Sequence, residues 1–435
     1  MDRRDFARAL AAVPALRLGL ASPGQDTIRV DGERLNRNLA ALAAHGRTPA
    51  GTNRVAYTEA DLAGREFVMG LMREAGLAVR IDTGGNILGR REGTARDLPV
   101  ILIGSHIDSV TDGGNYDGDV GSLGAIEVAH TLADRRLATR HPLEVVIFQN
   151  EEGGTIGSKM MAAGLTEAEL DRTARSGKTI REGTRFLGGD PARLAEARRK
   201  PGDLLCYFEL HIEQGGILDE AGIRIGVVEG IVGIRWYEVE IRGFANHAGT
   251  TPMDRRKDAM LAAAKLTVAV NQIVRSVPGR QVGTVGRLVP VPGTVNVIPG
   301  QVTMTIDLRD LSVETLALMS RRFETAAREI AAETGTTIAF RELSTNEPAF
   351  TDRRLRRVIA ESAERLGLST REMPSGAGHD AQEIARIAPM GMIFVPSVRG
   401  ISHSPEELSR PQDIANGADV LLHSVLAVDR RGLAG

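Results

Sequence analysis

The sequence lacks several features that would mark a specialised class of protein. Its 435 residues include one cysteine, Cys206. A single cysteine excludes an intramolecular disulfide and a thiolate-rich zinc site, and it leaves histidine and carboxylate side chains as possible metal ligands. Lys and Arg total 54 against 56 for Asp and Glu, a net charge of −2, and no long basic run occurs. A nucleic-acid partner is therefore not expected.

Long apolar runs are also missing. Beyond the N-terminal segment, no stretch approaches the roughly 18 uninterrupted apolar residues of a membrane span, so the mature protein is expected to be soluble. Residues 1–28 form a leader in which Arg3, Arg4 and Phe6 precede an apolar stretch, as in a twin-arginine export signal. Arg17 interrupts that stretch and the cleavage site is poor, so a short amphipathic or disordered leader is the alternative. Cytoplasmic and periplasmic locations both stay open.

The length and a hydrophobic content of 42% allow about two or three domains with a large core. Residues 29–232 alternate helical patterns with apolar runs at 100–103, 143–148 and 204–210. The same alternation resumes over residues 346–435, with a buried strand expected at 391–395. These patterns predict one α/β domain in two segments, with a mostly parallel sheet covered by helices.

Residues 233–345 follow a different pattern. Apolar and polar residues alternate over 237–242 and 302–309, which indicates strands with one solvent-exposed face. Helices are expected at 256–277 and 313–333, and further strands at 281–288 and 336–343. The resulting order β-α-β-β-α-β predicts an inserted α+β domain of the ferredoxin-like type.

Histidines and acidic residues follow each predicted strand of the α/β domain. They are His106 and Asp108, then Asn150, Glu151 and Glu152, then His211 and Glu213, and finally His403. In an open α/β sheet, ligands bind beyond the carboxyl ends of the strands, so these side chains are expected to meet in one cleft, joined by Asp117. A single histidine at a strand end is more often hydrogen-bonded structure than a ligand, but four such clusters point to a site.

This combination of residues suits two-metal hydrolysis. Two divalent ions about 3.5 to 4 Å apart hold a water, lower its pKa and polarise the bond under attack, and a bridging carboxylate holds both ions. The reaction also needs a base that is not a ligand. The adjacent Glu151 and Glu152 would supply base and ligand separately.

Nine motifs are similar to those of the zinc-dependent amidase branch of the M20 metallopeptidase family. That branch contains N-carbamoyl-L-amino-acid hydrolases, ureidopropionases and allantoate amidohydrolases. The motifs are GSHIDSV, GGNYDGDVG, NEEGG, ELHIEQG, NHAGTTPMD, TVNVIPG, DLRD, SGAGHDA and GISHSPEE. They occur in the family's order, and the resemblance runs from about Leu35 to the C-terminus.

The resemblance implies two divalent ions per subunit, zinc or else manganese, cobalt or nickel. The implied ligands are His106, Asp117 and His211 for one ion and Asp117, Glu152 and His403 for the other. Glu151 matches the general base, and Asp108 matches an acid that orients the first histidine. Most family peptidases have an acid at the position of His211, so the histidine favours an amidase over a dipeptidase.

The loop between the first two ligands is unusually rich in glycine. His106 and Asp117 are eleven residues apart, so the loop must fold back tightly if both are to bind one metal pair. Gly113, Gly114 and Gly118 are expected to supply the positive φ values of such a turn. A calcium-binding loop is the alternative, which is disfavoured because histidine is a poor ligand for a hard ion.

The resemblance also implies residues that bind the substrate. They are Gln214, His247, Asn296 and Arg309, which would hold a substrate carboxylate or polarise the scissile carbonyl. Arg309 would grip a carboxylate with both arms of its guanidinium, whereas a surface ion pair with Asp307 or Asp310 is the alternative. His247 is expected to reach the site of a neighbouring subunit as an oxyanion-hole donor, in a homodimer formed through an inserted domain that also acts as a lid.

The expected reaction is hydrolysis of a linear amide C–N bond, with an N-carbamoyl-L-amino acid as the leading substrate. Metal-hydroxide attack with Glu151 as base would release the amino acid, CO2 and ammonia. The alternatives are an allantoate amidohydrolase, which shares every motif, and an acylase or dipeptidase. A non-catalytic binding protein on the same fold is a further alternative, but degenerate relatives usually lose the base or a ligand, and here none is missing.

Overall fold

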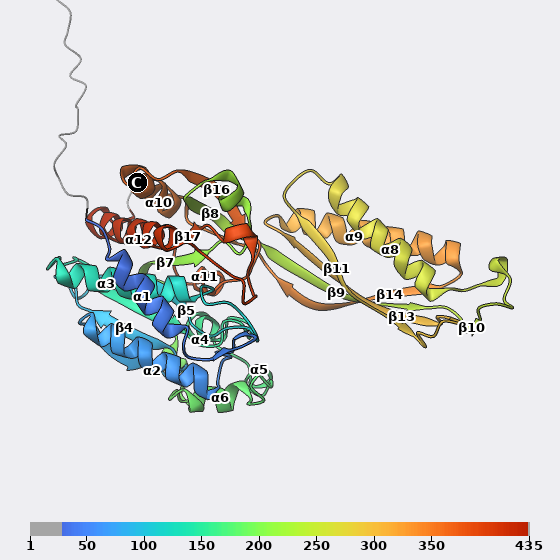
Figure 1. Ribbon diagram of the computed structural model, residues 1–435, viewed down its shortest axis with the longest axis horizontal. Coiled ribbons are helices and arrows are strands. Elements are labelled where there is room, and N and C mark those ends of the chain that lie inside the picture. Colours follow the sequence, from blue (N-terminus) through green and yellow to red (C-terminus); the bar gives the residue numbers. More distant parts are fainter. Residues whose placement is uncertain (1–27, 434–435) are drawn as a thin grey trace, which may run out of the picture.

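The computed structural model describes residues 28–433, which fold into two units (Figure 1). The core unit contains a nine-stranded sheet, and the inserted unit, residues 233–346, contains a four-stranded sheet. The predicted export signal lies outside the described residues. No helix within residues 28–433 combines the length and the apolar character needed to cross a membrane.

The core unit is built on a mixed sheet whose central strands are parallel. The strand order is β15-β8-β17-β7-β5-β6-β4-β3, with β16 beside β8. The central strands, which run parallel to one another, are β6 (Leu143–Phe148), β5 (Val100–His106), β7 (Leu204–Ile212) and β17 (Met390–Val395). The others are β3 (Ala78–Ile81), β4 (Ile87–Arg91), β8 (Ile225–Ile231), β15 (Ala349–Phe350) and β16 (Thr370–Ser375). The predicted α/β fold with a mostly parallel sheet is confirmed.

The central strands are apolar throughout because the sheet is covered on both faces. Along β5, Ile101 and Ile103 join one apolar cluster while Val100 and Leu102 join another on the opposite face. The long covering helices are α1 (Gly32–Leu42), α2 (Glu59–Glu74), α3 (Asp119–Asp134), α10 (Arg353–Arg365) and α12 (Pro411–Arg431). Shorter helices are α4 (Ile156–Ala162), α5 (Glu167–Leu170), α6 (Ile180–Phe186), α7 (Ile217–Ala221) and α11 (Asp380–Ile384), and a hairpin joins β1 (Arg47–Thr48) to β2 (Gly51–Thr52).

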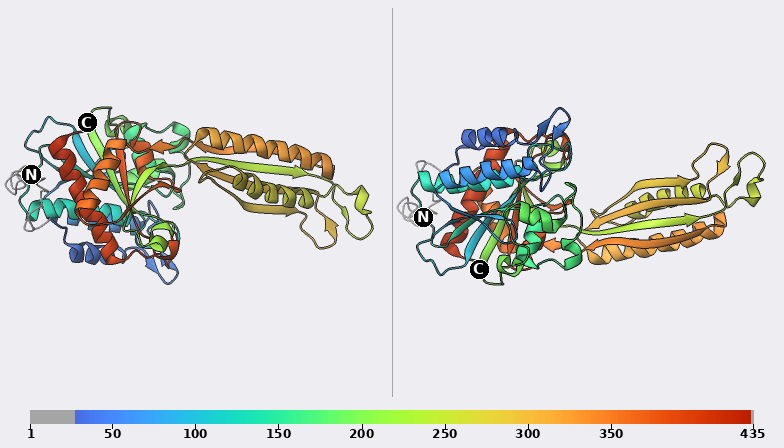
Figure 2. Two further views of the ribbon diagram at one scale, coloured as in Figure 1. Left: turned by 90° about the horizontal axis from the view of Figure 1, so that it is seen from above. Right: turned by 90° about the horizontal axis from the view of Figure 1, so that it is seen from below.

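The inserted unit has a β-α-β-β-α-β order along the chain. Its elements are β9 (Gly233–Arg242), α8 (Ala259–Ser276), β11 (Val282–Val291), β13 (Gln301–Asp310), α9 (Val313–Thr334) and β14 (Thr337–Asn346). The strands form an antiparallel sheet in the order β11-β13-β9-β14. Both helices lie on one face of this sheet (Figure 2), where they cover Val302, Met304 and Ile306. A two-stranded antiparallel sheet of β10 (Asn246–His247) and β12 (Val297–Ile298), which the sequence did not predict, lies at the far end.

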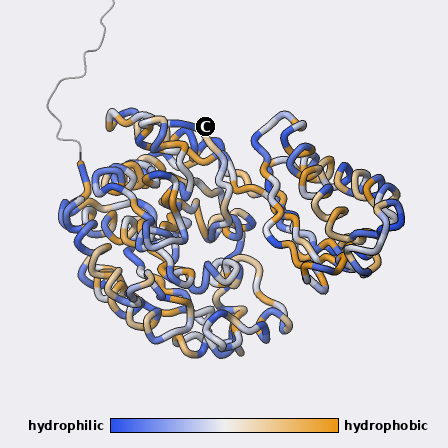
Figure 3. The backbone as a smooth tube through the Cα atoms, turned by 45° about the vertical axis from the view of Figure 1, so that its right-hand side comes forward, coloured by the Kyte–Doolittle hydropathy of each residue, from blue (hydrophilic) through white to orange (hydrophobic). Residues whose placement is uncertain are grey.

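The two units have separate apolar cores and a narrow junction. The core of the inserted unit is made of its own residues, and Figure 3 shows the two units as distinct bodies. The chain enters the inserted unit after Val232 and leaves it through Glu347 and Pro348. A side chain at Gly233 would come within 2.8 Å of the Pro348 ring, so glycine permits the two crossings to pack together.

Candidate active site

The ends of four parallel strands bring the predicted ligands into one cleft. His106 is the last residue of β5, and His211 is the last but one of β7. Both side chains are 1% exposed. Because each residue belongs to a strand, the backbone hydrogen bonds of the sheet fix the position of its Cα atom. Glu152 follows β6, and His403 lies in the loop after β17. The cleft has a volume of about 670 Å³, and these four side chains line it together with Asp117 and Glu151.

Two groups of potential metal ligands meet in this cleft. The first is His106, Asp117 and His211, and the second is Asp117, Glu152 and His403. Within each group the ligand atoms lie within 4.8 Å of one another. Asp117 Oδ1 lies 3.1 Å from His211 Nε2, whereas Asp117 Oδ2 lies 3.1 Å from His403 Nε2. Asp117 therefore presents a different oxygen to each group, as a bridging carboxylate does.

The charges of the cluster fit divalent cations. Burial and the charge of Asp117 raise the pKa of Glu152 to about 8. Burial also opposes ionisation of Asp117, but hydrogen bonds from His211 and His403 outweigh it and lower the pKa of Asp117 well below its usual value. The site thus gathers more acids than its own histidines neutralise. Imidazole nitrogens and carboxylate oxygens suit zinc, manganese, cobalt and nickel, so these residues fit a metal site.

Glu151 lies beside the ligands but belongs to neither group. Its Oε2 atom is 3.7 Å from His106 Nε2, and its side chain is 11% exposed. Burial, followed by the neighbouring charges of Glu152 and Asp380, raises its pKa well above the usual value. A carboxyl group with a raised pKa, in a cleft and beside a metal site, is suited to accept and return a proton.

Asp108 contacts His106 differently from the prediction, in which its carboxylate orients the His106 ring. Its backbone carbonyl, 3.0 Å from His106 Nδ1, orients the ring, whereas its carboxylate is 3.7 Å from that nitrogen. The carboxylate instead accepts the backbone N–H groups of Glu151 at 3.0 Å and Glu152 at 3.1 Å. Burial raises the pKa of Asp108 to about 6. Its side chain therefore positions the two glutamates rather than the histidine.

Strained backbone marks the loops that carry these residues. Asn150, Gln214 and His403 have φ values of 52°, 59° and 54°, which non-glycine residues seldom adopt. Such strain persists only where the surrounding structure holds it, and it concentrates at functional sites. Of the three loop glycines, Gly118 has the predicted positive φ, 67°, but Gly114 does not.

The three glycines are needed for different reasons. A side chain at Gly118 would approach the His106 ring to 2.4 Å, and one at Gly114 would approach the Glu407 carboxylate to 2.2 Å. Gly113 also lacks a positive φ, and a side chain there would meet Val110 at 3.0 Å. The prediction of positive φ values was thus wrong for Gly113 and Gly114, and Gly114 instead makes room for a neighbouring side chain.

Two of the predicted substrate-binding residues line the cleft. Gln214 donates from Nε2 to Asp117 Oδ2 at 2.6 Å. Arg309 pairs with Asp307 through Nε at 3.2 Å and Nη2 at 2.9 Å, and its Nη1 donates to the carbonyl of Gly376 at 2.8 Å. The ion pair considered as an alternative is therefore present, although Arg309 also borders the cleft.

The other two lie away from the cleft of their own chain. His247 is in β10 and Asn296 immediately precedes β12, and both are exposed. The N–H of Ala248 donates to the carbonyl of Asn296 at 3.0 Å. Figure 1 shows β10 at the end of the inserted unit farthest from the core unit. The structure therefore places Asn296 near His247, through Ala248, and separates both from Gln214 and Arg309.

His379 and Glu209 were not selected from the sequence, although they lie against the cluster. The His379 ring is 4.5 Å from that of His211, and burial lowers its pKa well below the usual value. Glu209 accepts hydrogen bonds from Ser105 Oγ at 2.7 Å and the N–H of Ala381 at 2.9 Å. Glu209 is two residues before His211 in a strand, so both side chains point to the same face of the sheet. This spacing could have identified Glu209 from the sequence.

Known proteins resemble the chain over nearly its whole length. A family model described as peptidase family M20/M25/M40 matches residues 102–427. The N-carbamoyl-L-amino acid amidohydrolase of Geobacillus stearothermophilus is 42% identical over 402 residues, covering 91% of this chain and 98% of that protein. The allantoate amidohydrolase of Escherichia coli strain K12 is 36% identical over 399 residues, covering 89% and 96%. A crystal structure of an amidase of the hydantoinase/carbamoylase family from Burkholderia multivorans superposes with a TM-score of 0.85 at 40% identity, covering 92% and 98%.

Proposed function

Because this chain belongs to peptidase family M20/M25/M40, we propose that it is a metal-dependent amidohydrolase that hydrolyses an N-carbamoyl-L-amino acid. The observation that carries the proposal is the position of Glu151, beside two ligand groups that share Asp117 but in neither of them. The 42% identity to an N-carbamoyl-L-amino acid amidohydrolase supports this substrate class. The E. coli relative supports allantoate as the second candidate.

Each residue of the cleft has a defined task in this reaction. Two divalent ions, when bound by the two groups, polarise the scissile carbonyl and make the attacking water more acidic. Glu151 takes a proton from the water as its oxygen adds to the carbamoyl carbon, and returns it to the nitrogen as the C–N bond breaks. The amino acid leaves, and the carbamate product breaks down to CO2 and ammonia. The carboxylate of Asp108 keeps Glu151 in place by accepting the backbone N–H of Glu151.

Arg309 and Gln214 are the residues of the same chain that would orient the substrate. A guanidinium binds a carboxylate with two parallel hydrogen bonds, which fixes its position and direction. Asp307 holds two nitrogens of Arg309, and Nη1 donates one N–H to the carbonyl of Gly376. The substrate carboxylate would therefore compete with Asp307 for that fork or accept the second N–H of Nη1. Gln214 donates to Asp117, so besides its contact with the substrate it would keep the bridging carboxylate directed at both ligand groups.

We further propose a homodimer in which the inserted unit is both the interface and a lid. His247 and Asn296 lie together at the far end of that unit, too distant to serve their own cleft without a large movement. The partner subunit's His247 and the partner subunit's Asn296 would then donate hydrogen bonds to the oxyanion that forms on the substrate. Edge strands of the inserted sheet offer unpaired backbone groups for pairing about a two-fold axis.

Mixing two inactive variants tests the shared site. His247→Ala and Glu151→Gln proteins are combined under conditions that allow subunit exchange. If His247 acts across the interface, each mixed dimer has one site with both defects and one with neither, and activity returns to at most about half the wild-type value per dimer. No recovery despite demonstrated exchange, or a monomer in solution, contradicts this part of the proposal.

Ammonia release tests the reaction itself. Purified protein is supplied with Mn²⁺, Co²⁺ or Zn²⁺ and with N-carbamoyl-L-methionine or allantoate, and Glu151→Gln serves as the control. An N-acetyl-amino acid is tested in parallel by release of the free amino acid, because its hydrolysis yields acetate and no ammonia. Faster ammonia release from the carbamoyl substrate supports the main proposal, and preference for allantoate supports the second candidate. The absence of turnover with every substrate and metal would favour a binding protein.

A further inference from the structure

Glu407 is a buried acid that the reaction above does not use. It belongs to the GISHSPEE motif, four residues after His403, and it is 4% exposed. Its Oε1 atom accepts the backbone N–H groups of Tyr116 at 2.9 Å and Asp117 at 3.1 Å. Its Oε2 atom accepts Ser402 Oγ at 2.8 Å and the N–H of His403 at 3.2 Å. One oxygen thus binds the Asp117 loop, and the other binds the His403 loop.

We propose that Glu407 is a positioning residue that ties these two loops together and thereby sets the separation of the two metal-ligand groups. The inference rests on the proposed function, because it concerns the same pair of ions. Glu407 does not line the cleft and contributes no atom to either group. It acts through the backbone of Asp117 and His403, whose side chains do contribute.

The need for such a tie follows from where the ligands lie. His106 and His211 belong to neighbouring strands β5 and β7, so the sheet fixes their spacing. Asp117 and His403 are on loops far apart in the sequence, and no strand pairing joins them. The second group depends on both loops, whereas the first group depends on one. Loss of the tie should therefore weaken the second group more than the first.

A carboxylate is the side chain suited to this position. It only accepts hydrogen bonds, so both of its oxygens can face N–H and O–H donors. A glutamine of the same shape would turn an NH2 group towards one of the two loops, where it cannot accept a backbone N–H, so at least one bond to that loop would be lost. The loop opposite also leaves space for Glu407, since a side chain at Gly114 would come within 2.2 Å of its Oε1. The backbone at Gly114 lies outside the positive-φ region, so this contact is what requires glycine.

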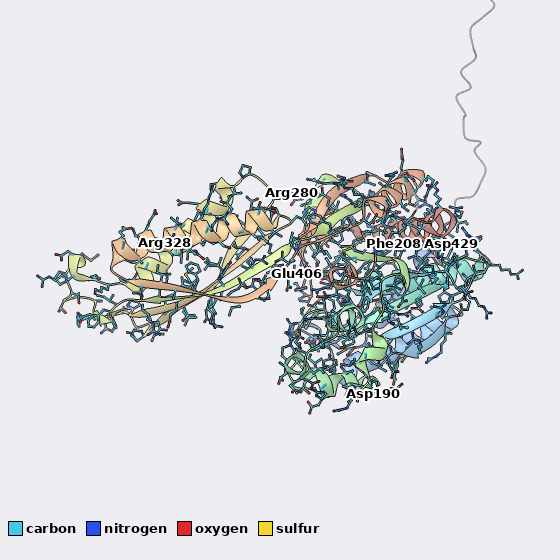
Figure 4. All side chains as sticks on the ribbon, turned by 180° about the vertical axis from the view of Figure 1, so that it is seen from behind. Asp190, Phe208, Arg280, Arg328, Glu406 and Asp429 are labelled. Carbon is cyan, nitrogen blue, oxygen red and sulfur yellow. The ribbon has the colours of Figure 1, made fainter. Side chains whose placement is uncertain are left out.

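The neighbouring glutamate provides a matched control. Glu406 lies in the same loop, is exposed, and bonds only to nearby residues of that loop, through its N–H to Ser404 and its carboxylate to Arg399. Figure 4 shows it at the surface where the core and inserted units meet. Glu406→Gln and Glu407→Gln remove the same charge from adjacent positions, so their difference measures the tie. Gly114→Ala disturbs the same contact from the other loop without changing any charge.

The experiment measures metal binding to the purified apoproteins by competition with a chromogenic Zn²⁺ chelator. In the wild type and in Glu406→Gln we expect two ions of comparable tightness. In Glu407→Gln and Gly114→Ala the weaker ion should bind about 10- to 100-fold less tightly, the usual effect of losing a residue that orients ligands. At limiting Zn²⁺ the content should fall towards one ion, and excess metal should restore activity, which a misfolded variant would not regain.

Metal affinities in Glu407→Gln and Gly114→Ala within about twofold of Glu406→Gln would overturn the inference while leaving the proposed function intact. A wild type that binds fewer than two ions would overturn the dinuclear proposal and this inference with it. If Glu407→Gln does not fold, Gly114→Ala decides the question by the same measurement, because it leaves the buried carboxylate in place.

Discussion

The adjacent glutamates Glu151 and Glu152 allow a sharp test of the proposed reaction. Both side chains are 11% exposed, and each can be changed to glutamine with the same loss of charge and almost no change of shape. Glu152 belongs to the ligand group with Asp117 and His403, but Glu151 belongs to neither group. The two substitutions should therefore fail for different reasons.

Glu151→Gln should bind metal like the wild type and lose most turnover. General acid–base catalysis contributes about 10² to 10⁴ in rate, which corresponds to a barrier increase of about 2.7 to 5.4 kcal/mol. Metal binding should be kept, because Glu151 belongs to neither ligand group. Glu152→Gln instead leaves two ligands in its group, so its metal content should fall towards one ion per chain.

The assay compares kcat for ammonia release at saturating metal with the metal content of the same samples by elemental analysis. We expect Glu151→Gln to keep the metal content of the wild type with little turnover, and Glu152→Gln to have a reduced metal content. A kcat for Glu151→Gln within about threefold of the wild type would refute its role as the base. Equal metal loss in both variants would refute the division of tasks between the two residues.

Three further outcomes are expected. Either His106→Ala or His403→Ala should lower the metal content from about two ions towards one, by loss from different groups; a wild type that never exceeds one ion after reconstitution would contradict this. Arg309→Lys should mainly raise KM for carboxylate substrates, because an ammonium cannot form the paired hydrogen bonds of a guanidinium; an unchanged KM would exclude Arg309 as the clamp. Metal binding should release protons and tighten as pH rises towards 9. Without metal, the hydrogen bond to Asp117 raises the pKa of His403 to about 9. Burial lowers the pKa of His211, but Asp117 outweighs this effect and raises that pKa to about 9 as well. Calorimetry in two buffers of different ionisation enthalpy measures this release, and identical heats in both would contradict it.

The central sheet could be predicted because its strands are continuous apolar runs, and the meeting of the ligands followed from their places at strand ends. His106 and His211 needed no further information, since a parallel sheet brings such ends to one edge. Alternation of apolar and polar residues likewise indicated β9 and β13, because one face of each packs on helices while the other contacts solvent.

Other features depend on contacts that a sequence pattern does not encode. Glu407 accepts from Tyr116, 291 residues away, so only the folded chain reveals the pairing. Gly114 was interpreted through its backbone freedom, but the actual constraint is the space occupied by another loop. The carboxylate of Asp108 was predicted to orient the His106 ring, but the ring nitrogen bonds to the backbone carbonyl of Asp108 instead. The small sheet that brings Asn296 near His247 consists of two-residue strands, too short to leave a periodic signal.

Because the junction at Val232 and Pro348 is narrow, a small rotation there causes a large displacement at the far end of the inserted unit. Strand β9 has 10 residues, so at about 3.3 Å per residue it extends roughly 33 Å from the junction before the chain reaches His247. A rotation of one degree at the junction then moves the far end by about 0.6 Å, and ten degrees moves it by about 6 Å. Catalytic groups must be held within about 0.5 Å, so if His247 acts on the partner's substrate as proposed, it tolerates about one degree of error at the junction. Substitutions that loosen the packing of Gly233 against Pro348 would therefore be amplified at the far end, and would reduce turnover without touching the metals, the base or the substrate.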